Sequence, residues 1–338
     1  MSPAEREECA RVVLPADVYD YYRATSGQES TLVGQARAWQ EVLLRPRLFQ
    51  DVSQVSTATT VLGLTVAGPV LVAPTAGHGL AHPDGEVATA RGVAAAGSVM
   101  VLSMRASSRI EAVAAEGASY WQQIYVLSDR GVSDEVATRA AAAGAAALVL
   151  TADTPFVARK SAGAPASLPL QGIIEALDRR RSSDVGLRQV PVRADDIGRL
   201  ARLTGLPVVV KGVLRGDEAA RCLDHGATAV IVSTHGGRQL EGVVPSPRAL
   251  ADVVGAIGDD AEVYVDGGIR TGVDVVRALG LGATAVLLGR PVLWALSTGG
   301  AEGVRELLES ITHETAEAMA LVGCPAVQDV GPDLVAFR

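Results

Sequence analysis

Short, uninterrupted apolar runs recur along this chain, and each is followed by polar or glycine-rich residues and then by a helical pattern. The clearest are the runs between residues 206 and 291, which read LPVVVKGV, ATAVIVSTHGGRQL, AEVYVDGGIRTG and ATAVLLGRPV. A Val/Ile/Leu run without alternation indicates a strand that is buried on both faces, as in a parallel sheet covered by helices. The segments between these runs, such as EAARCLDHG and GVDVVRALGLG, predict helices that end at glycine.

The same alternation begins at Pro69. Four further strands are predicted in PVLVAPT, SVMVLS, YWQQIYVL and AALVLTAD, and the first three are each followed by a helical segment. Eight such units, spaced by roughly 25–35 residues, predict a closed (β/α)8 barrel of the TIM type. We therefore expect one α/β domain over residues 1–338, with a helical lead-in at 1–68 and the barrel at 69–338.

Three segments interrupt or flank this alternation. Residues 10–38 predict two short helices joined by a turn at Ser26-Gly27, and the rest of the lead-in predicts an extended plug or hairpin. Residues 156–195 follow predicted strand four; they predict either a lid loop with a short helix in GIIEALDRRR, or disorder. Residues 299–324 predict an amphipathic helix, or a pair of helices, that closes the outer ring.

Composition narrows the class of protein. The 36 glycines and 4% aromatic residues predict a core of Ala, Val and Leu with tight turns. A net charge of −8 argues against a nucleic-acid partner, which requires a basic surface. We find no apolar run of the ~20 residues that a membrane helix needs and no signal-peptide core. Because Cys9, Cys222 and Cys324 form no CxxC pair, we expect a cytoplasmic protein without a metal site or disulfide.

Residues capable of chemistry cluster where the predicted strands end. In a barrel of this type the active site lies at that face, on the loops after the strands. The glycine-rich turns at 266–272 and 288–292 predict a phosphate site formed by backbone N–H groups and a helix N-terminus, with tight turns alone as the alternative. The residues concerned are Lys211, Ser233, His235, Arg238, Asp266, Arg270 and Arg290.

Three of these positions, together with Asp153 at the end of predicted strand four, suggest individual roles. A lysine such as Lys211 is costly at an apolar strand end unless it faces an anion or a polar site. His235 is a candidate base, which Asp153 could orient, and Arg238 suits a planar carboxylate. The residue types by themselves predict a phosphate-bearing ligand, a base and an anion clamp, without naming a reaction.

The same motifs resemble those of the FMN-dependent α-hydroxy acid oxidase and dehydrogenase family, which includes enzymes that oxidise glycolate, lactate and mandelate. The resemblance is carried by VKGVL, VSTHGGRQL, VDGGIRTGVDVVRALGLGATAVLLGRP, APTAGHGLAHPDGE and WQQIYV, and it spans nearly the whole chain. It implies FMN as cofactor and oxidation of an (S)-2-hydroxy acid to the 2-oxo acid, with O2 as acceptor and H2O2 as product. It also implies a homo-oligomer, most simply a tetramer.

The resemblance further implies roles for individual residues. His235 is the base, Asp153 stabilises its imidazolium, and Lys211 stabilises negative charge at the N1/O2 edge of the reduced flavin. Arg238 clamps the substrate carboxylate, and the hydroxyls of Tyr21 and Tyr125 bond to the substrate. The histidines of AGHGLAH, His78 and His82, support the loop after strand one. The residues expected to contact FMN are Pro74, Thr75, Ala76, Ser103, Gln123, Thr151, Lys211, Ser233, Asp266, Gly268, Arg270, Gly289 and Arg290.

This chain departs from the family in the expected substrate pocket. Lys160 stands where the family usually has the second of two paired arginines, so the charge is kept but the bidentate fork is lost. Arg105 stands where relatives often have an aromatic or small residue. It either replaces the missing guanidinium or suits a substrate with a second anionic or polar group. We therefore expect Arg105 and Lys160 to set substrate choice.

The sequence also allows other functions. Within the family, the alternatives are a decarboxylating monooxygenase and a tailoring oxidase that acts on a mandelate-like secondary-metabolite hydroxy acid. Outside it, the alternatives are a phosphate-binding barrel without flavin and a flavin-binding scaffold that has lost turnover.

Overall fold

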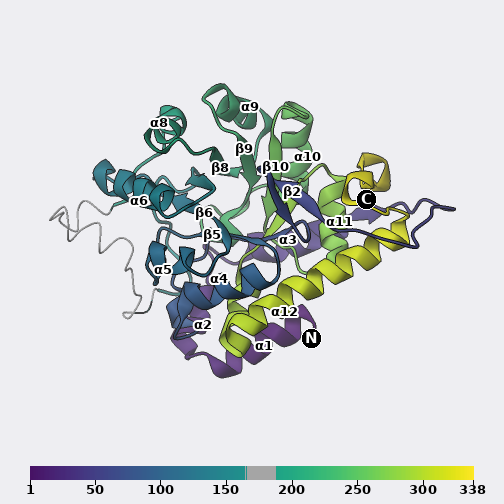
Figure 1. The fold of residues 1–338 in the computed structure, drawn as a ribbon, viewed down its shortest axis with the longest axis horizontal. Helices are drawn as coiled ribbons and strands as arrows, with labels where there is room; N and C mark the ends of the chain where they lie inside the picture. The colour runs from purple at the N-terminus through teal and green to yellow at the C-terminus, as the bar shows by residue number, and fades with distance from the viewer. Residues whose placement is uncertain (164, 166–187) are drawn as a thin grey trace.

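A closed barrel of eight parallel strands lies at the centre of the computed structural model, which describes residues 1–163, 165 and 188–338 (Figure 1). Consecutive strands are neighbours, and the last pairs with the first, which closes the barrel. The expected TIM barrel is confirmed. Its strands are β4 (Val70–Val72), β5 (Val99–Leu102), β6 (Ser119–Ile124), β7 (Ala147–Thr151), β8 (Val208–Val213), β9 (Ala229–Val232), β10 (Glu262–Asp266) and β11 (Ala285–Leu288).

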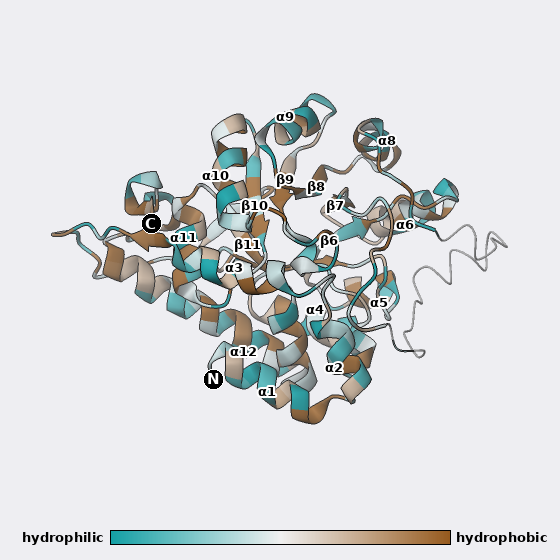
Figure 2. Cartoon of the chain, turned by 180° about the vertical axis from the view of Figure 1, so that it is seen from behind, coloured by the Kyte–Doolittle hydropathy of each residue, from teal (hydrophilic) through white to brown (hydrophobic). Residues whose placement is uncertain are grey.

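The apolar strands are buried on both faces. In β4, Leu71 belongs to the cluster inside the barrel, whereas Val70 and Val72 pack in the layer between strands and helices. Trp121 and Tyr264 fill the interior from β6 and β10, with ring centroids 5.2 Å apart. Figure 2 shows this apolar centre, with hydrophilic residues more frequent on the surrounding helices. Burial on both sides explains why the strands read as continuous apolar runs.

Helices surround the strands in the order expected. Most follow the predicted segments. The helix predicted over residues 299–324 is the part of the last helix that follows a break at Gly300 (φ 56°, ψ −140°), and the part before the break, from Arg290, was not predicted. The ring consists of α4 (Gly85–Ala95), α5 (Ile110–Ala114), α6 (Arg130–Ala142), α8 (Asp195–Thr204), α9 (Gly216–Asp224), α10 (Ser246–Ile257), α11 (Gly272–Gly280) and α12 (Arg290–Val322).

Helix α8 was not predicted. Its sequence carries ordinary signals: acidic Asp195 and Asp196 in the first turn, Arg202 in the last, and Gly205 as a left-handed C-cap (φ 72°). The predicted lid therefore extends one residue too far, into α8. Much of the rest of that predicted lid, including GIIEALDRRR, lies outside the described residues.

Three N-terminal helices cover the barrel's flank, α1 (Pro3–Val13), α2 (Ala16–Arg23) and α3 (Ser30–Gln40). The last two are the predicted pair, joined through the turn at Gly27 (φ 62°). Helix α1 was missed, although Ser2 and Glu5 form a capping box at its start. It packs against α12, and Figure 1 shows the two lying together.

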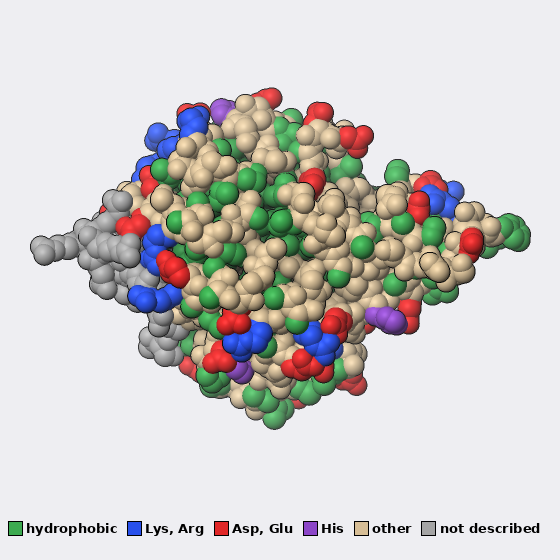
Figure 3. Space-filling model, viewed as in Figure 1, with side chains coloured by type: hydrophobic (Ala, Val, Ile, Leu, Met, Phe, Trp, Pro, Cys, Tyr) green, Lys and Arg blue, Asp and Glu red, His purple; other side chains and the backbone are tan. Residues whose placement is uncertain are grey.

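The predicted plug is a hairpin of β2 (Thr59–Val61) and β3 (Leu64–Val66). Val61 and Val66 pack into the apolar cluster inside the barrel, so the hairpin closes the end opposite the strands' carboxyl termini. An unpredicted pair, β1 (Val42–Leu44) with β12 (Val335–Phe337), joins the segment after α3 to the C-terminal end of the chain. No helix in the described part of the chain is long and apolar enough to span a membrane. On the face shown in Figure 3, charged side chains lie mainly toward the edges.

Candidate active site

A cavity of about 620 Å³ opens at the carboxyl ends of the barrel strands. Nearly all of the predicted site residues line it. Asp153 and Ser233 do not, but they contact lining residues directly, through His235 and Lys211. The predicted residues that line it are Tyr21, Pro74, Thr75, Ala76, Ser103, Arg105, Gln123, Tyr125, Thr151, Lys160, Lys211, His235, Arg238, Asp266, Gly268, Arg270, Gly289 and Arg290.

His235 and Asp153 form a hydrogen-bonded pair at the cavity wall. His235 follows β9, in the short 3-10 turn η3 (His235–Gly237), where it holds a left-handed φ of 54°. Its Nδ1 lies 3.0 Å from Oδ1 and 3.2 Å from Oδ2 of Asp153. Burial alone would raise the pKa of Asp153, but the charge and hydrogen bond of His235, with the charge of Lys211, hold it below its ordinary value. An ionised carboxylate only accepts, so Nδ1 carries the proton and Nε2 is left as an acceptor.

A glycine makes room for this pair. Gly212, in β8, has a φ of 104°, and a Cβ there would lie 2.5 Å from Cβ of Asp153. The register of β8 against β9 shifts between Lys211 and Val213, which is a β-bulge. Lys211 therefore lies within β8 and does not end it, and Asp153 lies two residues beyond the end of β7. Both predicted strand ends were wrong, although both side chains reach the site.

Lys211 is buried and paired. Its side chain donates to Oδ2 of Asp266 at 2.7 Å and to Oγ of Ser233. The other carboxylate oxygen of Asp266, Oδ1, is buried and has no partner among the described residues. A buried acceptor without a donor is costly, so a ligand with hydroxyl or N–H groups fits this edge of the cavity.

A polar network orders the adjacent part of the cavity wall, where Thr151 of β7 pairs in register with Lys211 of β8. Nε2 of Gln123 donates to Oγ1 of Thr151 at 3.0 Å, and its Oε1 accepts from the Met104 amide at 2.9 Å. The hydroxyl of Ser103 lies 3.5 Å from the same oxygen. These side chains come from three adjacent strands, and the network holds them in one orientation.

Two partly buried guanidinium groups lie at the glycine turns. Arg290 donates through Nε to the Tyr22 carbonyl at 3.0 Å and through Nη2 to the Gly236 carbonyl at 2.9 Å; Arg270 donates to the Ile269 carbonyl at 2.8 Å. Burial lowers the pKa of both, and with repulsion from Arg238 and Arg270 it brings that of Arg290 to about 9. Neither pairs with a carboxylate in the described part of the chain, so an anionic ligand would stabilise both.

The turns themselves suit a phosphate. Gly268 has a φ of 85°, and a Cβ there would lie 2.9 Å from Cδ1 of Trp39. Gly289 is the N-cap residue of α12, so the N-terminal N–H groups of that helix lie beside the two arginines. The phosphate site predicted at these turns is consistent with this geometry.

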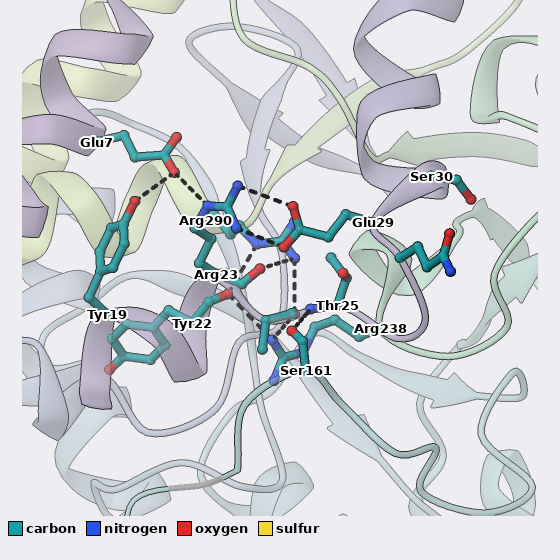
Figure 4. Close-up of polar contacts among 12 residues, drawn as sticks. Glu7, Tyr19, Tyr22, Arg23, Thr25, Glu29, Ser30, Ser161, Arg238 and Arg290 are labelled. Carbon is teal, nitrogen blue, oxygen red and sulfur yellow. Dashed lines mark hydrogen bonds and ion pairs between the residues drawn. The ribbon is translucent and has the colours of Figure 1, made fainter. Parts of the chain in front are cut away.

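Backbone carbonyls hold Arg238 in place. Its Nη1 donates to the carbonyls of Tyr21 at 2.9 Å and Ala24 at 2.6 Å, at the end of α2. Figure 4 shows Arg238 and Arg290 converging on this backbone, and the Tyr22 carbonyl accepts from both. The guanidinium carbon also lies 5.3 Å from the Tyr21 ring centroid. No local sequence pattern predicts this anchoring.

Two further cations approach the same part of the cavity. Lys160 donates to the Ala158 carbonyl at 2.8 Å and to Oε1 of Gln239 at 3.3 Å. Burial, with repulsion from Arg238 and Arg105, lowers the pKa of Lys160 to about 8. Arg105 lies over the ring of Tyr125, 5.7 Å from its centroid. Burial raises the pKa of Tyr125 to about 12, so its hydroxyl is a donor at neutral pH.

The loop after β4 rests on buried polar groups. His78 bonds through its two ring nitrogens to Oγ1 of Thr75 at 2.6 Å and Oγ1 of Thr89 at 2.8 Å, in line with its expected supporting role. Sequence reasoning missed Glu86. This buried carboxylate accepts from the amide of His78 and from the amide and hydroxyl of Ser107, which joins the loops after β4 and β5. A glutamate in the first turn of α4 was the only signal.

The barrel fold and the cationic cavity at its strand ends are typical of enzymes that bind a phosphate-bearing ligand, and comparison with known proteins identifies the family. The FMN-dependent dehydrogenase family matches residues 10–337. L-lactate oxidase of Nostoc sp. is 40% identical, with 96% of this chain and 95% of the relative covered. 4-Hydroxymandelate oxidase of Amycolatopsis orientalis is 38% identical, over 97% and 96%.

Comparison with solved structures finds the same kind of enzyme. The crystal structure of mandelate oxidase with (S)-4-hydroxymandelic acid superimposes with a TM-score of 0.90 at 36% identity, covering 100% of this chain and 98% of that one. The chain belongs to the FMN-dependent dehydrogenase family. It is an FMN-dependent oxidoreductase, and the two partly buried arginines, the glycine turns and the unpartnered Asp266 oxygen fit that cofactor.

Proposed function

We propose that the protein oxidises an (S)-2-hydroxy acid to the 2-oxo acid and that O2 reoxidises the flavin, with H2O2 as product. The observation that carries this proposal is that the His235–Asp153 pair and Arg238 face the same cavity as Arg270 and Arg290. A base and a carboxylate clamp thus lie beside a phosphate site. Relatives that are oxidases of lactate and 4-hydroxymandelate support the substrate class.

Different residues would hold the phosphate, the ribityl chain and the ring of FMN. Arg270, Arg290 and the start of α12 suit the phosphate, and Oδ1 of Asp266 suits a ribityl hydroxyl. Lys211 and the Gln123–Thr151 pair suit the polar edge of the ring. FMN, when bound, supplies the acceptor for the α-hydrogen and its electron pair. The remaining members of the expected set are Pro74, Thr75, Ala76, Ser103, Ser233, Gly268 and Gly289.

His235 takes the proton. Nε2 accepts the hydrogen of the substrate hydroxyl, the electrons of that O–H bond form the carbonyl, and the α-hydrogen leaves with the electrons of its own bond. Substrate thereby loses two electrons and two hydrogens. Asp153 holds the ring by Nδ1 and stabilises the imidazolium that forms.

Four side chains would orient the substrate. Arg238 presents the guanidinium donors that the α2 carbonyls do not use, and Lys160 adds a second cation. The hydroxyls of Tyr21 and Tyr125 line the same space, where they can bond to the carboxylate or the hydroxyl. Holding the carboxylate fixes the distance between the hydroxyl and His235, which is the main requirement for proton transfer.

An oxygen electrode with product analysis tests the acceptor. Consumption of O2 with equal amounts of H2O2 and 2-oxo acid supports the oxidase. Release of CO2 with an acid shortened by one carbon would identify a decarboxylating monooxygenase. Turnover with artificial dyes but not with O2 would identify a dehydrogenase.

We also propose a cytoplasmic homotetramer. Phe49 is 101% exposed and Leu48 is 70% exposed, and adjacent exposed apolar side chains of this kind support contact between subunits. Light scattering of the purified protein measures the mass directly, and a monomer would contradict the proposed assembly.

A further inference from the structure

The cavity is strongly cationic although the protein as a whole is acidic. The net charge of the chain is −8, yet among the described lining residues seven are Lys or Arg and one is a carboxylate. This excess concentrates positive potential where small ligands bind, and it selects anions. The cations are Arg105, Arg159, Lys160, Lys211, Arg238, Arg270 and Arg290, and the carboxylate is Asp266.

Three of the seven cations, on the cofactor side of the cavity, have their charge balanced by Asp266 or would have it balanced by a phosphate. Lys211 is paired with Asp266 at 2.7 Å. Arg270 and Arg290 flank the glycine turns, and a phosphate group there would carry about as much negative charge as the two guanidiniums carry positive charge. The remaining cations lie toward the substrate, and a single carboxylate balances only one of them.

Arg238 and Lys160 have enough donors for that single carboxylate. Arg238 uses Nη1 on backbone carbonyls, so Nε and Nη2 remain. Lys160 uses two hydrogen bonds, to Ala158 and Gln239, out of the three its ammonium can donate. With a tyrosine hydroxyl, these groups can satisfy both oxygens of an α-carboxylate.

Arg105 has no anionic partner among the described residues. Its guanidinium forms no hydrogen bond or ion pair within the described residues, although it lines the cavity. Its backbone is fixed, because its amide donates to Oγ of Ser103 and its carbonyl accepts from Gly77, both at 3.1 Å. Its side chain rests on the ring of Tyr125. A guanidinium held in this way presents its N–H donors in a geometry that suits a planar anion.

From these contacts we propose that the substrate is a 2-hydroxy acid with a second anionic group, most simply a 2-hydroxydicarboxylic acid, and that Arg105 binds that group. This inference rests on the proposed function and specifies its substrate class. The reaction is unchanged: the hydroxyl carbon is oxidised, His235 takes the hydroxyl proton, and the second carboxylate stays intact.

Binding of unreactive acids tests the inference without turnover. Calorimetry of the oxidised, FMN-loaded enzyme compares 2-oxoglutarate with 2-oxopentanoate, which have equal chain length and differ in a terminal carboxylate or methyl group. We expect the dicarboxylate to bind more tightly by about tenfold or more, and Arg105→Met to remove most of that difference. Arg105→Lys should keep part of it, since charge remains while the fork is lost.

A matched control separates a specific contact with Arg105 from the general positive potential of the cavity. Arg159 is an exposed cation at the same cavity, so Arg159→Met removes one charge without removing the fork of Arg105. It should leave the preference for the dicarboxylate nearly unchanged. An equal loss in both variants would overturn the role of Arg105.

Anaerobic flavin reduction extends the test to substrates. (S)-2-Hydroxyglutarate should reduce the flavin faster at low concentration than (S)-2-hydroxypentanoate. Comparison of malate with 3-sulfolactate then distinguishes a carboxylate from a sulfonate as the second group. A wild-type preference for monocarboxylates, or an Arg105→Met variant that loses both kinds of acid equally, would overturn the inference while leaving the proposed function intact. Reduction by no 2-hydroxy acid would instead contradict the proposed function.

Discussion

Nδ1 of His235 lies 3.0 Å from Oδ1 of Asp153, although 82 residues separate them in the chain. The two side chains reach one another because β7 and β9 end at the same rim of the barrel, and because Gly212 between them has no side chain. The carboxylate sets the tautomer and leaves Nε2 as the acceptor. The chemistry proposed here depends on that nitrogen.

Replacement of His235 by Gln should slow flavin reduction by about 10²–10⁴-fold, because the amide cannot take the hydroxyl proton. FMN should remain bound, since the predicted phosphate contacts are untouched. Stopped-flow absorbance of the FMN-loaded variant measures the rate, and the visible spectrum of the purified protein measures occupancy. Reduction at the wild-type rate would remove His235 from the role of base.

Substrate capture should weaken in mildly alkaline solution. The pKa of Lys160 is lowered to about 8, so its ammonium is charged below that pH and neutral above it. For a carboxylate substrate, kcat/KM should therefore fall as the pH rises through about 8. Lys160→Arg keeps its charge throughout and should extend the plateau to higher pH. Identical profiles for the two proteins would show that Lys160 does not contact the carboxylate.

Replacement of Arg290 by Met should weaken FMN binding by about 10- to 100-fold, because a charge-assisted contact to the phosphate is lost. Riboflavin is the matched control ligand, since it lacks the phosphate, and its affinity should not fall. Fluorescence titration of apoprotein with each flavin gives both dissociation constants. Parallel losses for FMN and riboflavin would place Arg290 away from the phosphate.

Replacement of Glu86 by Gln should lower the free energy of unfolding by about 2–4 kcal/mol, because an amide nitrogen would face donors that a carboxylate oxygen now accepts. Glu86 is 1% exposed and accepts from His78 and Ser107. The control is Glu8→Gln, which removes an exposed charge paired with Arg11 and should leave stability nearly unchanged. Urea unfolding of both variants measures the difference, and equal stabilities would refute a supporting role for Glu86.

The barrel could be predicted because its strands are buried on both faces, so each reads as an uninterrupted apolar run. Lys211, His235 and Arg290 stood out for the same reason, as charged or polar residues directly beside such runs. Resemblance to a family then assigned them roles that residue types alone left open. Geometry now shows these side chains around one cavity.

Contacts between distant segments could not be predicted. Arg238 is held by carbonyls of α2, more than 200 residues away, and no local pattern encodes that contact. The bulge at Lys211 depends on the register between two strands, which the apolar run does not specify. The start of α12 was missed because the last predicted strand segment, ATAVLLGRPV, extends over Arg290–Val292, which are the first residues of the helix.

Anaerobic mixing tests whether this cavity oxidises 2-hydroxy acids on FMN. Purified protein is mixed with a panel of mono- and dicarboxylic 2-hydroxy acids while the flavin absorbance near about 450 nm is followed. We predict bleaching by at least one (S)-acid, faster for those with a second carboxylate, and return of colour in air. A colourless protein that cannot be reconstituted with FMN, or a yellow protein that no 2-hydroxy acid bleaches, would contradict the account.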